Sequence, residues 1–165
     1  MACKSNDPVV LSDEDRFLVK VTEDLPSLDT CYRFVVKNSG GSGAVSTFVG
    51  ITRDTFQNKR VLKLSYEGYV PMAEKELFKL CHDTCKKYAS VQKIAAVHIL
   101  GDCPVGHASV ILAASSPHRR EAMHAAEYLI DELKRRIPIW KKEVYEGDSS
   151  VWKENAETRE MERCS

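Results

Sequence analysis

Residues 115–143 constrain the fold more than any other stretch, because they hold the start, body and end of one long amphipathic helix. Ser116 is a good N-cap and Pro117 suits the first helical position, where its missing N–H costs nothing, so we predict that the helix begins there. Pro138 would clash with the preceding turn and pushes its neighbour out of the α region, so the helix should end by residue 137. Residues 139–144 are then predicted to form a strand.

The predicted helix has one apolar face and two basic residues that touch it. At about 100° per residue, this face gathers six apolar side chains that should pack into the core. They are Ala122, Ala126, Leu129, Ile130, Leu133 and Ile137. Arg119 falls inside the same face, and Lys134 lies on its edge. Either a bound anion or a buried partner carboxylate would explain an arginine in that position.

The start of this helix carries charges that oppose its own stability. His118, Arg119 and Arg120 all fall in the predicted first turn. A cation there opposes the helix dipole by roughly 0.3–1 kcal/mol, whereas a bound anion would reverse the sign. Exposed N–H groups beside basic side chains are typical of a phosphate or carboxylate site.

A second basic cluster lies at the end of the helix, where residues 134–142 hold five Lys or Arg and no acid. The three at the helix end suit a C-terminus, but Lys141 and Lys142 lie beyond the proline and need another reason. The whole chain has 24 Lys plus Arg and 24 Asp plus Glu. The basic character is therefore local, which argues against a general binder of nucleic acids or membrane surfaces.

The six cysteines include no CxxC pair and point to reduced thiols. Cys81 and Cys85 share one face of a predicted helix, and together with His82 they are candidate metal ligands. Buried core thiols explain the pair better, because cysteine is among the most buried residue types. We therefore expect no metal site.

Length and N-terminus predict a single cytosolic domain. A chain of 165 residues can bury a core without support from metals or disulfides. The opening MACKSNDPVVLSDED has no apolar h-region, and no apolar run approaches membrane-spanning length. We assign residues 1–14 to a flexible tail, residues 15–152 to one domain and residues 153–165 to a polar tail.

The remaining periodicity predicts strands interleaved with helices. Strands are expected over residues 16–22, 44–53, 61–69, 91–100 and 108–115, and helices over 26–38 and from 71 to about 88. The second and third of these strands should form a hairpin across the polar loop 54–60. This order indicates an α+β fold with a largely antiparallel sheet and packed helices.

Three further polar residues lie at strand ends. Arg53 closes one predicted strand, and a plain surface arginine is its simpler explanation. His98 and His107 fall in or beside two later strands, and we interpret both as packed or solvated residues rather than ligands.

Five motifs, in one order and spacing, take the interpretation further. They read FVGITRD, LSYEGYVPMAEKEL, VHILGDCPVG, SSPHR and LKRRIPIWKKE. Together they resemble the large, catalytic subunit of molybdopterin synthase over residues 44–152. The resemblance implies a fold of the α/β-hammerhead type and a cytosolic sulfurtransferase of molybdenum cofactor biosynthesis, with no resident cofactor.

The implied reaction adds two sulfurs to cyclic pyranopterin monophosphate and so forms the dithiolene of molybdopterin. In this family the sulfur arrives as a thiocarboxylate on the C-terminal Gly-Gly of a small ubiquitin-like subunit. Two large subunits form a central dimer with one small subunit at each end, which gives a heterotetramer. Clustered cations suit this chemistry, because they neutralise two approaching anions and the charge that builds in the transition state.

The family's basic residues all have matches in this chain. The matches are Arg53 in GITRD, His118 and Arg119 in SPHR, Lys134 in LKRRIP and Lys141 in WKKE, with Lys142 and Glu143 as further substrate-binding candidates. We assign proton exchange to Lys134, and phosphate or tail clamping and a second acid role to Lys141. Arg119 and Lys134 lie roughly 22 Å apart on one helix, so His118 and Arg119 of one subunit should complete the pocket of the other.

The C-terminal tail departs from the family pattern. Some relatives carry a tail arginine that approaches the neighbouring subunit's site, and residues 152–157, WKENAE, have none. Either Lys153 substitutes for it or the contact is absent. Two other classes compete with the synthase: a non-enzymatic module that binds a phosphorylated ligand or acidic tail, and a phosphohydrolase, for which the chain lacks an evident metal–carboxylate cluster.

Overall fold

The computed structural model describes residues 13–147 and 151–153. The predicted tails, residues 1–14 and 153–165, therefore fall almost wholly outside the described residues. Of the WKENAE segment, only the backbone of Trp152 and Lys153 is described. Of the predicted N-terminal tail, residues 13 and 14 belong to a short helix, α1 (Asp13–Arg16).

Three longer helices follow α1. They are α2 (Leu28–Val36), α3 (Val70–Lys87) and α4 (Arg119–Arg136). Helix α2 begins where the Ser27 hydroxyl accepts the N–H of Thr30 at 3.1 Å. Helix α3 carries Pro71 in its first turn, where the ring disturbs no hydrogen bond. Among the described residues, every helix is too short or too polar to span a lipid bilayer.

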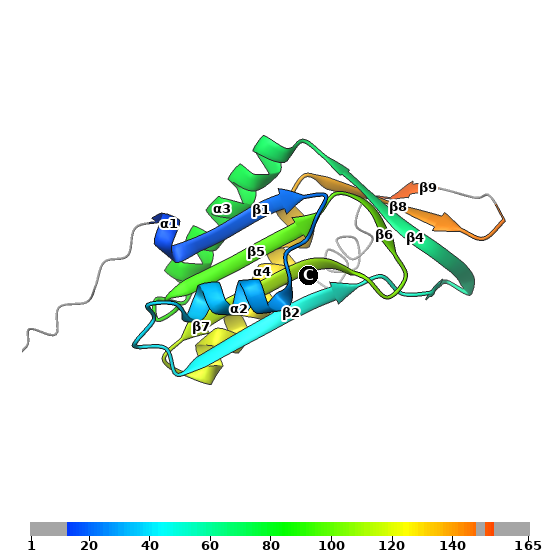
Figure 1. The fold of residues 1–165 in the computed structure, drawn as a ribbon. Helices are drawn as coiled ribbons and strands as arrows, with labels where there is room; N and C mark the ends of the chain where they lie inside the picture. The colour runs from blue at the N-terminus through cyan, green and yellow to red at the C-terminus, as the bar shows by residue number, and fades with distance from the viewer. Residues whose placement is uncertain (1–12, 148–150, 154–165) are drawn as a thin grey trace, which may run out of the picture.

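The strands form two sheets, which Figure 1 shows at opposite ends of the molecule. In the first, the order is β1 (Phe17–Thr22), β5 (Lys93–Ile99), β7 (Ala108–Ser116) and β2 (Ala44–Ile51). In the second, the order is β3 (Thr55–Phe56), β4 (Lys59–Gly68), β8 (Ile139–Tyr145) and β9 (Val151–Lys153), and β6 (Gly101–Pro104) also pairs with β4. Only the β1–β5 pairing is parallel among the described strands, so the predicted α+β fold with largely antiparallel pairing is confirmed.

The predicted hairpin between residues 44–53 and 61–69 is wrong. Strand β2 pairs with β7, and β4 pairs with β6 and β8 in the other sheet. The loop between them makes a local hairpin of its own, because Gln57 and Asn58 both adopt positive φ, as a two-residue β-hairpin turn requires. The chain therefore turns back within β3 and β4 and never brings β2 beside β4.

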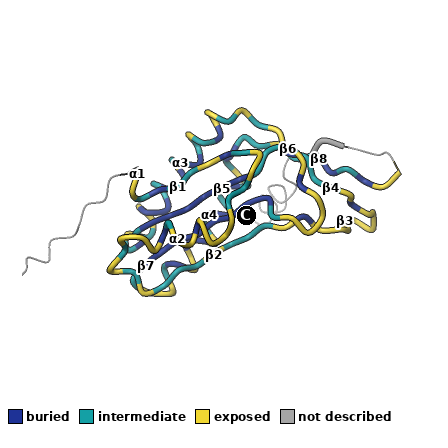
Figure 2. The backbone as a smooth tube through the Cα atoms, viewed as in Figure 1, coloured by how far each residue is buried: buried dark blue, intermediate teal, exposed yellow. Residues whose placement is uncertain are grey.

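Two apolar layers enclose the first sheet. Successive residues of its central strands point to opposite faces, so Ile94 and Ala96 pack with α3 and α4, while Ala95 and Val97 pack under α2. Figure 2 shows β5 and β7 as the most continuously buried strands. All six residues of the predicted apolar face are buried, and four of them, Leu129, Ile130, Leu133 and Ile137, lie in the larger layer.

Helix α4 begins two residues later than predicted. Ser116 is the last residue of β7, where it pairs with Ala44 and its hydroxyl lies 3.1 Å from that of Ser90. It is therefore not the N-cap. His118 takes that position, without a side-chain hydrogen bond to the helix. The predicted end of the helix is confirmed, because Ile137 is the C-cap.

Candidate functional site

A pocket of about 330 Å³ opens where the two sheets meet the end of α4. Strands β2, β5 and β7 form one side of it, and β4 and β8 form another. The last turns of α4 close the third side with the apolar side chains of Ile130, Leu133 and Ile137. The site is thus assembled from segments that are far apart in the sequence.

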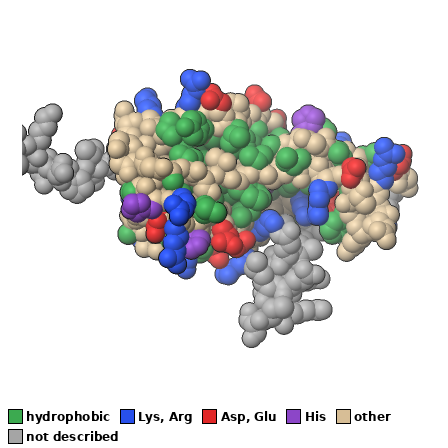
Figure 3. Space-filling model, turned by 90° about the horizontal axis from the view of Figure 1, so that it is seen from below, with side chains coloured by type: hydrophobic (Ala, Val, Ile, Leu, Met, Phe, Trp, Pro, Cys, Tyr) green, Lys and Arg blue, Asp and Glu red, His purple; other side chains and the backbone are tan. Residues whose placement is uncertain are grey.

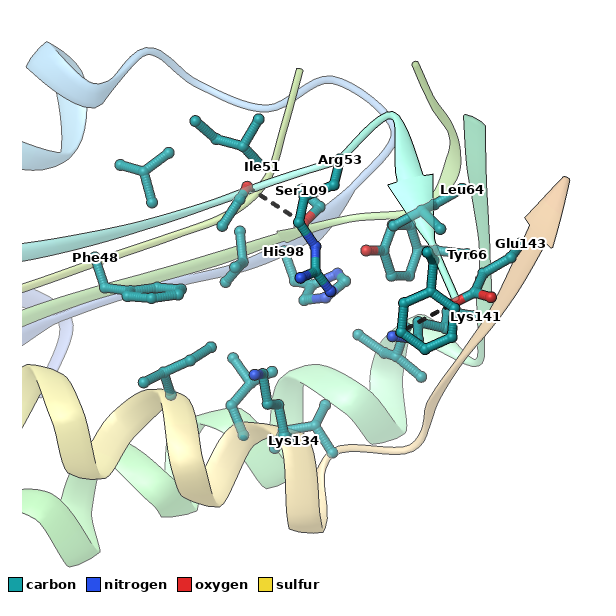
Figure 4. A pocket seen from close by; sticks show the side chains of 18 of the residues that line it. Phe48, Ile51, Arg53, Leu64, Tyr66, His98, Ser109, Lys134, Lys141 and Glu143 are labelled. Carbon is teal, nitrogen blue, oxygen red and sulfur yellow. Dashed lines mark hydrogen bonds and ion pairs between the residues drawn. The ribbon is translucent and has the colours of Figure 1, made fainter. Parts of the chain in front are cut away.

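Three cationic side chains enter this pocket from three different segments. Figure 4 shows Arg53, Lys134 and Lys141 pointing toward the same space. We call these three residues the cationic wall. Glu143 is the only acidic residue that lines the pocket among the described residues, so positive charge exceeds negative charge by two. Such an excess in a partly enclosed site favours a multiply charged anion.

Arg53 reaches the pocket from a rigid backbone. The preceding residue, Thr52, is buried, and its N–H donates to the carbonyl of His107 at 3.0 Å. Its hydroxyl lies 3.2 Å from the Cys103 sulfur. The Arg53 guanidinium lies 5.9 Å from the centre of the Phe56 ring, a separation at which a cation and a ring attract. The backbone that carries Arg53 is therefore ordered before any ligand enters.

Helical spacing gives Lys134 a role different from that of its two basic neighbours. Arg135 pairs with Glu132 at 3.3 Å, and Arg136 pairs with Asp83 on α3 at 2.9 Å. Both pairs lie on the surface of the helix end. Lys134 instead follows the edge of the apolar face and lines the pocket, as the sequence predicts.

Strand alternation divides the basic run of β8. Lys141 and Glu143 both line the pocket, with the ammonium 4.0 Å from one carboxylate oxygen. The hydroxyl of Tyr145 donates a short hydrogen bond to the other oxygen of Glu143, which is 3% exposed. Lys142 lies between them and does not line the pocket, so the structure separates it from the other candidates. The buried carboxylate thus helps to hold Lys141 in place.

A polar surface that the sequence did not predict lines the same pocket as these cations. Tyr66, His98 and Ser109 all line the pocket and are nearly buried. We call these three residues the acceptor floor. Burial lowers the pKa of His98 to about 4, and a hydrogen bond from its ring to the Ile99 carbonyl opposes this only in part. Burial likewise raises the pKa of Tyr66, and its contact with Ser109 opposes the shift.

His98 could have been found from the sequence. It continues the alternation of Ile94 and Ala96 toward the end of a buried strand, and a polar residue in that register is expected to face a cavity or a partner. Its ring contacts the Tyr66 ring edge-on, with centroids 4.9 Å apart.

His118 and Arg119 lie at the opposite end of α4, and both are exposed. The prediction that Arg119 shares the buried face is wrong, because the helix begins at this residue and its side chain extends beyond the core. Neither side chain has an ion pair within residues 13–147 and 151–153. Figure 3 shows basic and histidine side chains gathered over the end of the molecule where α4 begins.

The cysteines of α3 belong to the core. Cys81 is fully enclosed, and burial raises the pKa of its thiol well above the usual range. His82 packs its ring against Phe17 and Phe78. Within the described ranges, no group of three or more His, Cys, Asp and Glu side chains is placed to hold a metal ion.

Known proteins match the chain over most of its length. The family described as MoaE protein matches residues 21–136. The molybdopterin synthase catalytic subunit of Bos taurus is 46% identical over 147 residues, which cover 89% of this chain and 76% of that protein. The protein of the same name from Drosophila sechellia is 56% identical over 119 residues, which cover 72% of this chain and 32% of that protein. The crystal structure of molybdopterin synthase from Staphylococcus aureus has a TM-score of 0.76 and 32% identity, covering 82% of this chain and 96% of that chain.

The matched proteins differ in length. This chain spans about a third of the Drosophila relatives but about three quarters of the bovine one. The family match runs from the end of β1 to the end of α4 and includes Arg53 and Lys134 of the cationic wall. It covers well over half of the sequence, and an antiparallel α+β relative superposes along nearly its whole length. The chain therefore belongs to the MoaE family, whose relatives here are named molybdopterin synthase catalytic subunits.

Proposed function

We propose that this chain is the catalytic subunit of a molybdopterin synthase. It transfers sulfur from the thiocarboxylated C-terminus of a small ubiquitin-like subunit to cyclic pyranopterin monophosphate, a sulfurtransferase reaction of the cytosol that forms the molybdopterin dithiolene. Family membership supports the assignment, and the word "subunit" in the relatives' names agrees with a partner chain. The observation that carries it is the convergence of Arg53, Lys134 and Lys141 in one pocket.

The cationic wall suits a reaction between two anions. The substrate carries a cyclic phosphate, and the sulfur donor is a thiocarboxylate, so their approach is opposed by repulsion unless both charges are neutralised. Arg53 offers a forked set of donors that matches phosphate oxygens. Lys134 and Lys141 supply two mobile point charges, of which Lys141 is oriented by Glu143. The pocket therefore favours the pair of reactants over either one alone.

The same lysines suit the chemical step. A thiocarboxylate sulfur forms a C–S bond with its electron pair while a C–O bond of the substrate breaks and the departing oxygen takes a proton. Lys134 donates that proton in the proposal, and Lys141 binds the phosphate or the small subunit's tail and serves as the second acid. Water then cleaves the thioester, which leaves the sulfur on the substrate and a carboxylate on the small subunit.

Residues outside the pocket fit a dimer in this proposal. His118 and Arg119 of one subunit complete the pocket of its partner, because a single α4 cannot bring both of its ends to one small phosphate. Lys142, which does not line the pocket, contacts the small subunit in this proposal. The assembly is a central dimer with one small subunit at each end, and it needs no resident cofactor.

The test is to incubate the chain with cyclic pyranopterin monophosphate and a thiocarboxylated small subunit, and to measure the dithiolene product. Product formation is expected with the small subunit and not with sulfide alone at physiological concentration, because the sulfur must be delivered as an anion on a tail. Ligand binding without turnover would instead favour the binding module. Robust product from sulfide alone would contradict the requirement for a partner.

A further inference from the structure

The pocket has two chemically opposite sides. The cationic wall offers hydrogen-bond donors to an anion. The acceptor floor, with His98 and Ser109 from the first sheet and Tyr66 from the second, carries an imidazole, a hydroxyl and a phenol. An apolar ring could lie on Phe48, Leu64 and Val110 without any polar floor, so the floor needs a separate reason.

The hydrogen positions on His98 follow from its surroundings. Nδ1 lies 2.7 Å from the Ile99 carbonyl oxygen, and a carbonyl can only accept, so Nδ1 carries the hydrogen. The ring is 6% exposed and lies in the same pocket as three cations, so it remains neutral. Nε2 is then a bare acceptor. It has no hydrogen bond among the described residues and is not one of the enclosed unpartnered atoms, so it opens toward the pocket.

The hydrogens of Tyr66 and Ser109 can be assigned in the same way. The Ser109 hydroxyl donates to the Gly50 carbonyl at 3.4 Å. The Ser109 oxygen can then accept from the hydroxyl of Tyr66, with which it interacts. The lone pairs of the Tyr66 oxygen remain available. The Tyr66 ring meets the His98 ring edge-on, and both side chains line the same pocket.

We propose that the acceptor floor determines ligand specificity by reading N–H donors on the edge of a flat heterocycle, with His98 Nε2 and the Tyr66 oxygen as its two acceptors. This inference rests on the proposed function and deepens it. A reduced pterin has ring N–H and amino donors along one edge and an anionic group at the other end. Such a ligand would span the pocket from the floor to the cationic wall. A ligand that offers only acceptors at that edge would leave both floor atoms unpaired.

The first experiment separates the two sides of the pocket with two ligands. Equilibrium binding of cyclic pyranopterin monophosphate and of a phosphate-free tetrahydropterin is measured for the wild type, His98→Phe, His98→Gln and Lys134→Ala. His98→Phe removes one buried acceptor and should weaken the binding of both pterins about tenfold. In His98→Gln the amide oxygen takes the place of Nε2, so most of the affinity should return. Lys134→Ala should weaken only the phosphate ligand.

The outcomes are distinguishable. If the wild type binds neither pterin, both the proposed function and this inference fail. If the wild type binds both and His98→Phe binds them equally well, the function stands and the acceptor floor does not read the ring. Inorganic phosphate serves as a matched probe, and a large loss of phosphate binding in His98→Phe would show a structural defect of the pocket and overturn the inference.

A second measurement needs no substitution. In the ¹⁵N-histidine-labelled chain, the His98 Nε2 signal should be that of an unprotonated nitrogen, and it should shift on saturation with the tetrahydropterin. The signal of His124, which is exposed and does not line the pocket, is the internal control and should stay in place. An Nε2 signal that is already protonated, or that does not respond to a bound pterin, would refute the role of His98.

Discussion

The two ends of α4 carry similar residues under opposite conditions. At its C-terminal end, Lys134 lines an enclosed pocket, and its basic neighbours are held in surface ion pairs. At its N-terminal end, His118 and Arg119 extend into solvent and lack an ion pair in the described part of the chain. The helix dipole favours cations at the first end and opposes them at the second.

This difference separates residues that serve their own subunit from residues that serve something outside it. Basic residues at a helix C-terminus need no function, because they stabilise the helix. Arg119 gains nothing from its own helix and contacts no carboxylate in residues 13–147 or 151–153, so an external anion is the better explanation. The proposed composite site provides that anion in the neighbouring subunit.

Loss of the pocket cation should have the largest effect. Lys134→Ala is expected to lower single-turnover sulfur transfer by at least about a hundredfold, because charge stabilisation and proton donation are both removed. Arg135→Ala is the matched control, since it removes the adjacent cation from the same helix end and should leave transfer close to normal. Near-normal transfer by a folded Lys134→Ala protein would end the assignment.

Mixing two inactive variants should restore activity. Arg119→Ala and Lys134→Ala chains are combined under conditions that exchange subunits. In a mixed dimer one composite site holds both substitutions and the other holds neither, so about a quarter of the wild-type activity should return after random exchange. A mixture that exchanges subunits yet stays inactive would place both residues in the same subunit's site.

The buried and exposed histidines should differ in their effect on acid stability. The pKa of His98 is about 4 in the fold and about 6.5 in the unfolded chain, so the unfolded state binds the extra proton between these values. The free energy of unfolding should therefore decrease as the pH drops from 6.5 toward 4, by up to roughly 3 kcal/mol.

Urea unfolding at pH 7 and pH 5 measures this effect. His98→Gln should make the free energy of unfolding depend less on pH. Subtracting the wild-type pH dependence from that of the variant removes the contribution of other titrating groups. His118→Gln is the control and should keep the wild-type slope. An unchanged slope in folded His98→Gln would show that His98 does not cause the acid sensitivity.

Arg119→Ala should have the smallest effect on stability. The Arg119 side chain packs against no core residue and opposes the helix dipole. The melting temperature of the variant should therefore equal or slightly exceed that of the wild type. Leu129→Ala changes a buried residue in the middle of the same helix and is the comparison for a structural role. It should lower the free energy of unfolding by about 2–5 kcal/mol. A comparable loss in Arg119→Ala would mean that the residue serves its own fold.

The sequence predicts the helices and most strands because their periodic patterns are long. It fails where tertiary pairing decides between two local options. Ser116 has the chemistry of an N-cap, but pairing with Ala44 extends β7 through it. The polar loop 54–60 gives no sign that Gln57 and Asn58 will adopt positive φ, because glycine, the usual signal, is missing.

The site was predictable where one residue's register follows from its own element. Helical periodicity places Lys134 at the edge of the apolar face, and it lines the pocket. Lys141 was singled out by the basic run beyond Pro138 and by the family resemblance, and strand alternation now separates it from Lys142. Arg53 gained its role only from the family resemblance. Strand register could have placed His98 at the cavity, but its contact with Tyr66 depends on how the two sheets lie against each other, which no local pattern encodes.

The backbone around Thr52 decides when Arg53 loses its conformational freedom. The N–H of Thr52 donates to the His107 carbonyl, and the N–H of Gly106 donates back to the Thr52 carbonyl. Both amides should exchange with solvent only when this part of the fold opens. The entropy of ordering this backbone is lost once, during folding, rather than at each turnover. A substrate therefore has only the exposed Arg53 side chain left to order.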